Sequence, residues 1–432
     1  MDNISIAKCL KQDRDNYWLL YYLVLGIIQA SWTDLNVFPP APLRFAMIIA
    51  AFGPLFIKPQ FVPMAFMFNI TVNRYIATTY TYLPTDINLY LFILIPLYFK
   101  NRRKINSHSA KYLKVFITLA VYWAFVDLIN LGELGTYAKF CIIPILSGLF
   151  IKDEKSLHIF SAGFIMACAL LSIYYYINYE KFLFTWNSAE SIERSGWCDP
   201  NYFSTALGVG YMFSMLYLLG VLKSRLIVFH PIVLAACSFF IALAVVMLAS
   251  RAGFICIIAI TAILLFMSQI KMKWTLLAIC LVIVAGYYIF TSGYFDVLYY
   301  RLFEQGNIDT AGNRTELWQM IIDNQGEQGL FYVLFGGGFW HRAVLTNGAD
   351  PHSEILAIFA DYGIIGLLLY LTLLFSLFTP RKNEFKIVNI PLLFYVLTVL
   401  SLSHFQYPTI SFLISWICGA KMLLKCKELY NH

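Results

Sequence analysis

Charged residues are scarce in this sequence, because Asp, Glu, Lys and Arg together make up only 13% of its 432 residues. Hydrophobic residues make up 60%, and the mean hydropathy of +0.69 lies far outside the balance of soluble domains. The composition predicts an integral membrane protein. Its apolar stretches of about 17 to 22 residues suit α-helices that cross the bilayer, whereas a β-barrel would show short alternating strands.

Several patterns of soluble enzymes are also missing. The nine cysteines form no Cys-x-x-Cys pair and fall mostly within apolar stretches, so neither a zinc site nor a disulfide framework is indicated. No Lys-Ser or Lys-Thr follows Gly336-Gly337-Gly338, which excludes a P-loop there. Tandem repeats, heptads and low-complexity linkers are missing too. Residues 1–432 are therefore expected to form a single integral membrane domain.

The apolar stretches predict an all-α polytopic protein with about 12 to 14 transmembrane helices. The first stretch lacks a small-residue cleavage site, so we expect a retained span and not a signal peptide. The expected spans are residues 17–32, 41–57, a weak one at 59–72, 83–99, 112–130, 137–151, 157–177, 202–222, 227–249, 252–269, 274–291, 353–378, 388–405 and 409–424.

The distribution of basic residues predicts the orientation, because cytoplasmic loops carry the excess of Lys and Arg. Placing the N-terminus inside puts most of the 31 basic residues in the cytoplasm, including the clusters at 100–104 and 421–427. The net charge of +7 then reflects topology and gives no support for nucleic-acid binding. Both termini are expected in the cytoplasm. Two sizeable outer loops follow, residues 179–201 and 292–351, the larger with a helix near 315–324.

Four basic side chains fall on the predicted outer side, where a loop meets a helix: Arg194, Arg251, Arg314 and His352. Three of these places resemble helix starts. Asp199-Pro200 and Asp350-Pro351 each set an acidic N-cap before a proline at the first helical position, and Ser250 can cap the helix that begins at Arg251. Each helix would point its N-terminus outward.

Outward helix N-termini together with arginine predict an anion site. Free N–H groups give such an end partial positive charge, and the planar guanidinium makes bidentate bonds to phosphoryl oxygens. A phosphate or pyrophosphate fits this site. Histidine, whose ordinary pKa is about 6.5, can accept a proton from a hydroxyl near neutral pH. The four residues together suggest group transfer from a phosphate-activated donor.

Each side chain also has an ordinary structural interpretation. Arg251 can anchor the chain at the membrane boundary, and His352 can simply be a polar residue at a helix start. Arg194 and Arg314 can form surface ion pairs with acidic neighbours, which are Glu190 or Glu193 for the first and Glu316 or Asp309 for the second.

A metal site and a phosphate loop are two further alternatives in the larger loop. His341, Asp350, His352 and Glu354 are metal-ligand types, but no His-x-x-x-His pair or Cys partner supports them. The three glycines can approach a phosphate, although a flexible loop explains them as well. We expect no metal and no cofactor.

The same residues resemble a known family. His352-Ser353, nine further residues and Gly363-Ile364-Ile365-Gly366 are similar to the His-[Asn/Ser/Gln]-x9-Gly-x-x-Gly signature of the O-antigen ligase and O-antigen polymerase superfamily. Arg251 in SRAG resembles the family's Ser-Arg helix start. Arg194 before DPNYF, and Arg314 followed by Trp318 and LFGGGFW, resemble two further segments. The resemblance covers roughly residues 190–380.

The resemblance implies a metal-independent glycosyltransferase of the GT-C type, with its active site at the periplasmic face of the bacterial inner membrane. The donor would be a glycan linked to undecaprenyl pyrophosphate. Arg194, Arg251 and Arg314 would bind the pyrophosphate, and His352 would activate the acceptor hydroxyl. The implied partners are membrane lipid, a lipid-linked or lipid A-core acceptor glycan and a chain-length regulator. Nothing is carried over to Arg301, His341 or Arg342.

Two versions of this enzyme fit the motifs. A polymerase transfers the growing glycan to another lipid-linked repeat unit, and a ligase transfers it to the lipid A core. The chain is rich in aromatic residues and has unusual loops. Both features suit an enzyme that is specific for one repeat unit, and they favour the polymerase. A flippase for lipid-linked sugars is the alternative from another class. Transporters often have inverted repeats and ionisable groups near the midplane, whereas here the charged residues gather at one face and no repeat is visible.

Overall fold

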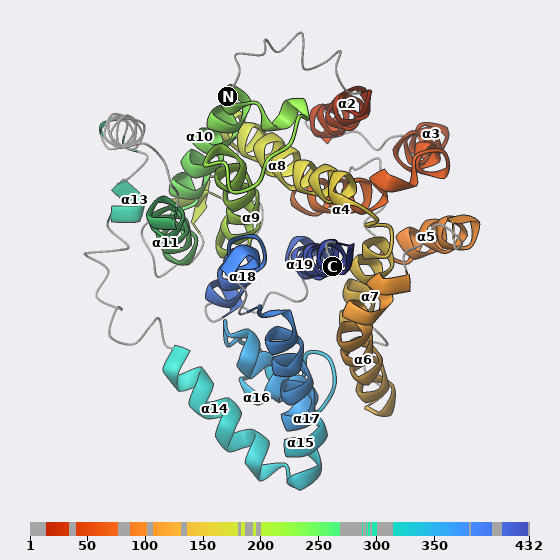
Figure 1. Cartoon of the computed structure of the whole chain (residues 1–432). Coiled ribbons are helices and arrows are strands. Elements are labelled where there is room, and N and C mark those ends of the chain that lie inside the picture. Colours follow the sequence, from red (N-terminus) through yellow and green to blue (C-terminus); the bar gives the residue numbers. More distant parts are fainter. Residues whose placement is uncertain are drawn as a thin grey trace. The chain divides into compact units, whose positions relative to one another are not determined.

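A computed structural model of the chain, shown in Figure 1, is predominantly helical. It describes residues 14–33, 40–76, 87–101, 107–130, 136–179, 183–185, 193–195, 200–267, 296–299, 314–379, 382–399 and 408–430, with single positions between 287 and 293.

The chain divides into two compact units. The first comprises Met1–Pro54, Met67–Thr85 and His158–Gln305, and the second comprises Leu55–Phe66, Asp86–Leu157 and Gly306–His432. The prediction of a single membrane domain with two periplasmic loops stays a prediction.

The first half of the chain supplies most helices of the first unit. They are α2 (Asp15–Thr33), α3 (Ala41–Phe52), most of α4 (Val62–Ile76) and α8 (Glu154–Ile177), α9 (Pro200–Leu218), α10 (Pro231–Met247), α11 (Arg251–Met267) and α13 (Asp296–Tyr299), with a short 3-10 turn at Ile227–Phe229. Two further 3-10 turns, Gly53–Phe56 and Pro59–Phe61, lie between α3 and α4. Two strands in the predicted smaller loop, β1 (Leu183–Thr185) and β2 (Glu193–Ser195), pair antiparallel.

The second unit contains α5 (Ile87–Asn101), α6 (Ser107–Ile129), α7 (Thr136–Gly148), α14 (Arg314–Glu327), α15 (Leu330–Phe335), α16 (His341–Leu345), α17 (Glu354–Leu377), α18 (Lys382–Val399) and α19 (Pro408–Tyr430). Helices α14, α15 and α16 lie within the predicted larger loop and group around the start of α17 (Figure 1). The helix predicted near residues 315–324 is therefore confirmed as α14.

Every expected apolar span overlaps a helix in the described residues, except 274–291, which lies mostly outside them. Within the described part of the chain, α8 and α17 are long and apolar enough to cross a membrane alone. Residues Ala41–Phe56 and Pro59–Ile76 together make a third candidate, bent by 117°. The chain is thus a helical membrane protein, and the count of 12 to 14 spans stays a prediction.

Small residues allow close helix packing in both units. A Cβ added at Gly210 of α9 would strike Cys168 of α8, and one at Gly253 of α11 would strike Ser204 of α9. In the second unit, Ser415 of α19 donates a hydrogen bond to Pro144 O of α7 (2.8 Å). Such contacts matter in a membrane, where helix association depends on packing and not on expulsion of water.

Candidate functional site

Arg251 begins α11 in the first unit, as the sequence predicts. Ser250 caps this helix, because its Oγ accepts a hydrogen bond from Gly253 N (3.2 Å). The preceding residue, Ala249, adopts a left-handed backbone with φ +50° and is buried. This tight turn leaves the Arg251 side chain partly exposed at the very end of the helix.

The start of α11 lies beside the start of α9. The Ser250 hydroxyl donates to Asn201 Oδ1 (3.1 Å), and Gly253 packs against Ser204. Helix α9 begins at Pro200, which confirms the predicted first position, whereas its proposed cap Asp199 lies outside the described residues. Two helix N-termini therefore lie side by side at the same end of the first unit, with Arg251 as the first residue of α11, and their dipoles favour an anion there.

Arg194 belongs to β2, opposite Phe184 of β1 in the antiparallel register. Its side chain lies outside the described part of the structure. The expected ion pair with Glu190 or Glu193, and the expected role in pyrophosphate binding, both stay predictions.

Arg314 is the first residue of α14 in the second unit, and its side chain is partly exposed. One turn further, the Trp318 indole N–H donates to Pro351 O (2.9 Å). This bond ties the helix that carries Arg314 to the turn that carries His352. The structure thus associates these two predicted site residues through the elements that hold them.

The predicted helix start at Pro351 was wrong. Helix α17 begins at Glu354, with Ser353 at the N-cap and no side-chain cap bond. Asp350 Oδ1 instead accepts a hydrogen bond from His352 N (2.9 Å), which is a turn made by the aspartate with its own backbone two residues on. His352 precedes the helix and has φ +51°.

That backbone conformation is uncommon for a residue with a side chain, and such residues concentrate at functional sites. Two hydrogen bonds fix the turn: Trp318 donates to the carbonyl of Pro351, and the backbone N of His352 donates to Asp350. Its rigid placement suits a side chain that must meet a substrate in one orientation.

Arg342 is a buried charge that the sequence did not assign. Its guanidinium lies 2.7 Å from Asp361 Oδ2, and its backbone N donates to Asp361 Oδ1 (2.8 Å). Asp350 Oδ2 lies 3.9 Å away, and Trp340 stacks on the guanidinium with its ring centroid 4.4 Å from Cζ. Arg342 and Asp361 have no exposed side-chain surface. This network joins α16, α17 and the His352 turn.

The sequence did contain a signal for this pair. Asp361 is the one acid of α17 beyond its first residue, Glu354, and an acid inside an apolar helix requires a partner because an unpaired charge is costly there. The partner lies 19 residues earlier in the chain. No local periodicity could identify it.

Helix α17 breaks at Gly363, which has φ +67°. The carbonyl oxygens before the break accept hydrogen bonds from outside the helix: Ala360 O from Gly337 N (3.4 Å), Asp361 O from Gly338 N (2.8 Å) and Tyr362 O from Tyr122 Oη (3.1 Å). In a membrane protein, backbone groups freed by a break need such partners. The glycine run therefore supports the break in α17.

Glycine is required on both sides of this contact. A Cβ at Gly336 would overlap the backbone of Asp361, and one at Gly363 would overlap the carbonyl of Leu334. Gly366 brings α17 close to Tyr122 of α6, where Trp123 and Tyr362 stack at 5.1 Å. Both glycines of the Gly-x-x-Gly segment thus have a packing role. The packed glycine run corrects the flexible-loop interpretation, and no phosphate role is assigned to it.

His341 directly precedes Arg342 and is partly exposed. It shares a 2.8 Å hydrogen bond with Gln328 Oε1 and stacks on Tyr332. Burial lowers the pKa of His341 below its ordinary 6.5. Within the described residues no group of three or more His, Cys, Asp and Glu side chains could hold a metal. The expectation of catalysis without a metal stays a prediction.

The structure therefore places the four predicted residues in two pairs. Arg194 and Arg251 belong to the first unit, and Arg314 and His352 belong to the second. Arg251, Arg314 and His352 each stand at or just before the N-terminal end of a helix. These features define a helical membrane protein with basic residues at its helix starts.

Residues 235–371, about a third of the chain, match the family model of O-antigen ligases. The matched stretch contains Arg251, Arg314, His352 and the Gly363-x-x-Gly366 segment, whereas Arg194 precedes it. The match confirms the resemblance of this part of the chain to the O-antigen ligase and polymerase superfamily that was found in the sequence. No curated protein matches the chain.

Proposed function

We propose that this protein is a glycosyltransferase that moves a glycan from undecaprenyl pyrophosphate to an acceptor hydroxyl at the periplasmic face of the inner membrane. The observation that carries the proposal is the family match over residues 235–371, together with His352 in a fixed turn at the start of α17. The GT-C architecture and the cytoplasmic termini belong to the same proposal.

The proposed reaction is a single in-line displacement. His352 accepts the proton of the acceptor hydroxyl while the hydroxyl oxygen bonds to the anomeric carbon. The bond from that carbon to the pyrophosphate oxygen breaks, and the lipid pyrophosphate leaves with the electron pair. The configuration at the anomeric carbon is inverted. General-base assistance of this kind contributes about 100-fold to 10,000-fold.

Arg194, Arg251 and Arg314 are proposed to stabilise the charge that develops on the leaving pyrophosphate. Stabilisation of developing charge is usually the largest catalytic contribution, and a guanidinium keeps its positive charge at any working pH. The paired N-termini of α9 and α11 support this role for Arg251, because both favour an anion at the same end of the unit.

We propose that the enzyme is a polymerase of surface polysaccharide, acting on lipid-linked repeat units, with a chain-length regulator as a further partner. A ligase that transfers the glycan to lipid A core is the second candidate, and the description of the matched family as O-antigen ligase favours it. The family match supports glycan transfer over a flippase function.

Complementation of a deletion strain tests the site. Plasmid-borne His352→Ala or Arg251→Ala, expressed at the wild-type level, should fail to restore long-chain surface polysaccharide. His341→Ala and Arg225→Ala are matched controls on residues outside the proposed reaction, and both should restore it. Long polysaccharide made by the His352→Ala and Arg251→Ala strains would refute the assigned site.

The glycolipids of the deletion strain separate polymerase from ligase. Loss of a polymerase should leave a single repeat unit on the lipid A core. Loss of a ligase should leave long chains on undecaprenyl pyrophosphate. Analysis of both lipid fractions by gel electrophoresis and mass spectrometry distinguishes the two outcomes.

A further inference from the structure

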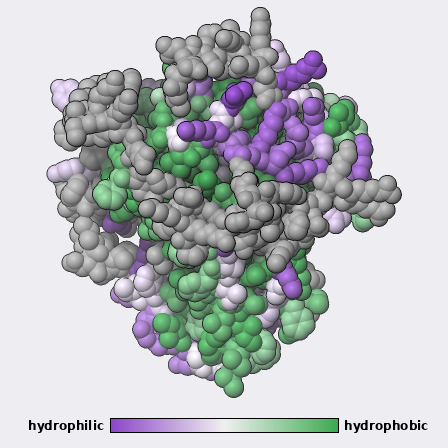
Figure 2. Space-filling view, in the orientation of Figure 1, coloured by the Kyte–Doolittle hydropathy of each residue, from purple (hydrophilic) through white to green (hydrophobic). Residues whose placement is uncertain are grey.

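Helix α15 (Leu330–Phe335) is apolar, carries no charge and leaves side chains exposed. Leu330 is 72% exposed and Phe331 is 48% exposed. Figure 2 shows hydrophobic surface at the position where Figure 1 draws α15. Neighbouring exposed apolar side chains on one short helix mark an interaction surface.

The far end of α17 fixes one polar boundary of the second unit. There the Lys421 ammonium of α19 donates to Ser376 O (2.6 Å) and Phe378 O (2.8 Å). A charged amine at the end of an apolar helix marks the edge of the hydrocarbon core, because such a group is costly further inside.

The length of α17 between the Lys421 boundary and the break at Gly363 is shorter than the hydrocarbon core is thick. The hydrocarbon core must therefore extend beyond Gly363. From Phe378 to Gly363 the helix rises about 22 Å, at about 1.5 Å per residue. The hydrocarbon core is about 30 Å thick, so roughly 8 Å remain, and any tilt of the helix increases this shortfall. The backbone of Leu334 touches Gly363 at this depth. Helix α15 therefore lies beside the last part of the core.

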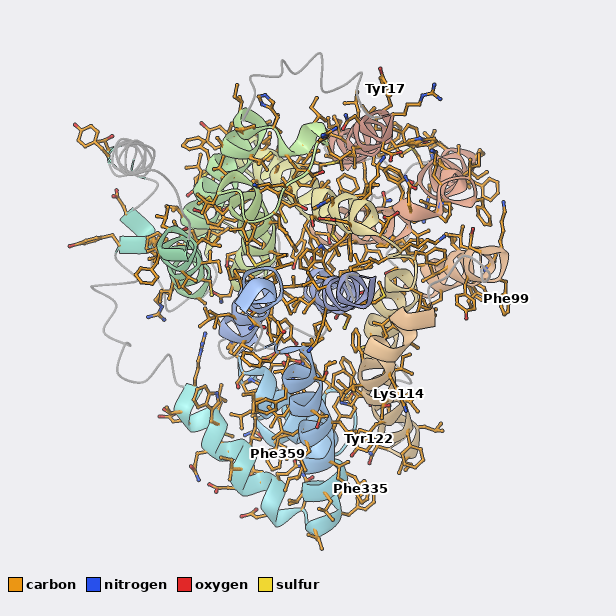
Figure 3. All side chains as sticks on the ribbon, viewed as in Figure 1. Tyr17, Phe99, Lys114, Tyr122, Phe335 and Phe359 are labelled. Carbon is orange, nitrogen blue, oxygen red and sulfur yellow. The ribbon has the colours of Figure 1, made fainter. Side chains whose placement is uncertain are left out.

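Exposed apolar residues continue toward this level along α6 and α17. Leu368 of α17 is 57% exposed, and Leu128 in the last turn of α6 is 54% exposed. The backbone N of Phe339 donates to Asp127 Oδ1 of that turn (2.8 Å), and Trp340, 41% exposed, comes next. Tryptophan is typical of the membrane interface. In Figure 3, the labelled Tyr122 and Phe335 mark α6 and α15 in this part of the unit.

We propose that α15 is an interfacial helix, seated in the lipid leaflet on the His352 side of the membrane. Leu330 and Phe331 insert at the boundary between acyl chains and headgroups, and Trp340 lies at headgroup level. Bilayer lipid covers this surface, because α15 lies at the depth of the hydrocarbon core and carries no charge that would keep the helix out of the lipid. The proposal requires α17 to span the membrane and does not require His352 to be catalytic.

Spin labelling of the full-length protein in phosphatidylethanolamine and phosphatidylglycerol vesicles tests this placement. Leu330→Cys is the test variant, Leu368→Cys is the lipid-facing control, and Gln319→Cys on the exposed face of α14 is the water-facing control. Wild-type protein treated in the same way gives the background from native cysteines.

The ratio of label collisions with oxygen to those with a water-soluble nickel complex should be several-fold higher at positions 330 and 368 than at position 319. A ratio at 330 equal to that at 319 would overturn the proposal. Shielding of 330 from both reagents would overturn it too, because protein would then cover the helix. Restored polysaccharide with Leu330→Cys in the deletion strain verifies folding and keeps this test separate from the proposed catalytic role.

Discussion

Arg342 and Asp361 form a buried ion pair that fixes the position of α16 against α17. Removal of one partner leaves a charge without compensation in a medium of low dielectric constant, whereas removal of both can be nearly neutral. The pair anchors α16 to α17, and Asp350 lies within 3.9 Å of the same guanidinium. The pair therefore lies directly beside the turn that carries His352.

Arg342→Met should lower the free energy of unfolding by about 3 to 5 kcal/mol. The double variant Arg342→Met, Asp361→Leu should recover part of that loss, because it removes the uncompensated carboxylate. Thermal unfolding in detergent measures both changes, with Gln319→Ala as an exposed control. If Arg342→Met were as stable as wild type, the ion pair would not anchor α16 to α17.

His341 should make stability depend on pH. Burial lowers the pKa of His341 in the folded protein below 6.5, so the unfolded chain binds more protons between the two pKa values. The stabilisation is complete above about pH 6.5 and is lost as pH falls through the folded pKa. The unfolding temperature of wild type should therefore drop more on acidification than that of His341→Gln. If the unfolding temperatures of wild type and His341→Gln changed equally with pH, His341 would not be the source of the pH dependence.

The break in α17 connects the glycine run to the Gly-x-x-Gly segment. A straight helix would satisfy its own carbonyl groups and would leave α15 and α16 without their backbone contact. Gly363 permits the positive φ, and Gly337 and Gly338 supply the N–H groups that the break demands. Phe359, labelled in Figure 3, then packs against the small core of Ile321, Leu345 and Ala360.

Gly363→Ala should destabilise the protein by more than about 2 kcal/mol, because a Cβ must adopt a left-handed backbone and also strike Leu334 O. Gly326→Ala in α14 is the matched control. A Cβ there meets nothing within 4 Å, so this change should be neutral or stabilise by about 0.5 to 1 kcal/mol. Chemical denaturation in detergent compares the two. Equal stability of the two variants would argue against a strained break at Gly363.

The proposed reaction uses both Arg251 and His352, which are assigned to the leaving pyrophosphate and to the acceptor hydroxyl. Residues that act on one transition state give strongly non-additive losses. If each single alanine variant already reduces transfer by about 100-fold or more, the double variant should lose little further activity. Assays of purified variants with a lipid-linked glycan donor measure this. Multiplied losses in the double variant would indicate independent roles.

Composition and apolar length alone determined that this is a helical membrane protein, and nearly every predicted span became a helix. Residue type and capping pattern also determined the helix starts at Pro200 and Arg251, because these signals are local. The proline rule failed at Pro351, where Asp350 bonds to the His352 backbone in place of capping a helix.

Only the tertiary structure decided the rest. The partner of Arg342, the break in α17 and the contact between Gly336 and Asp361 depend on segments that meet after folding, so no local periodicity encodes them. The sequence suggested three arginines for an anion site and His352 as the base, and the structure revealed what fixes His352: a turn held by Trp318 and Asp350, beside a buried charge pair.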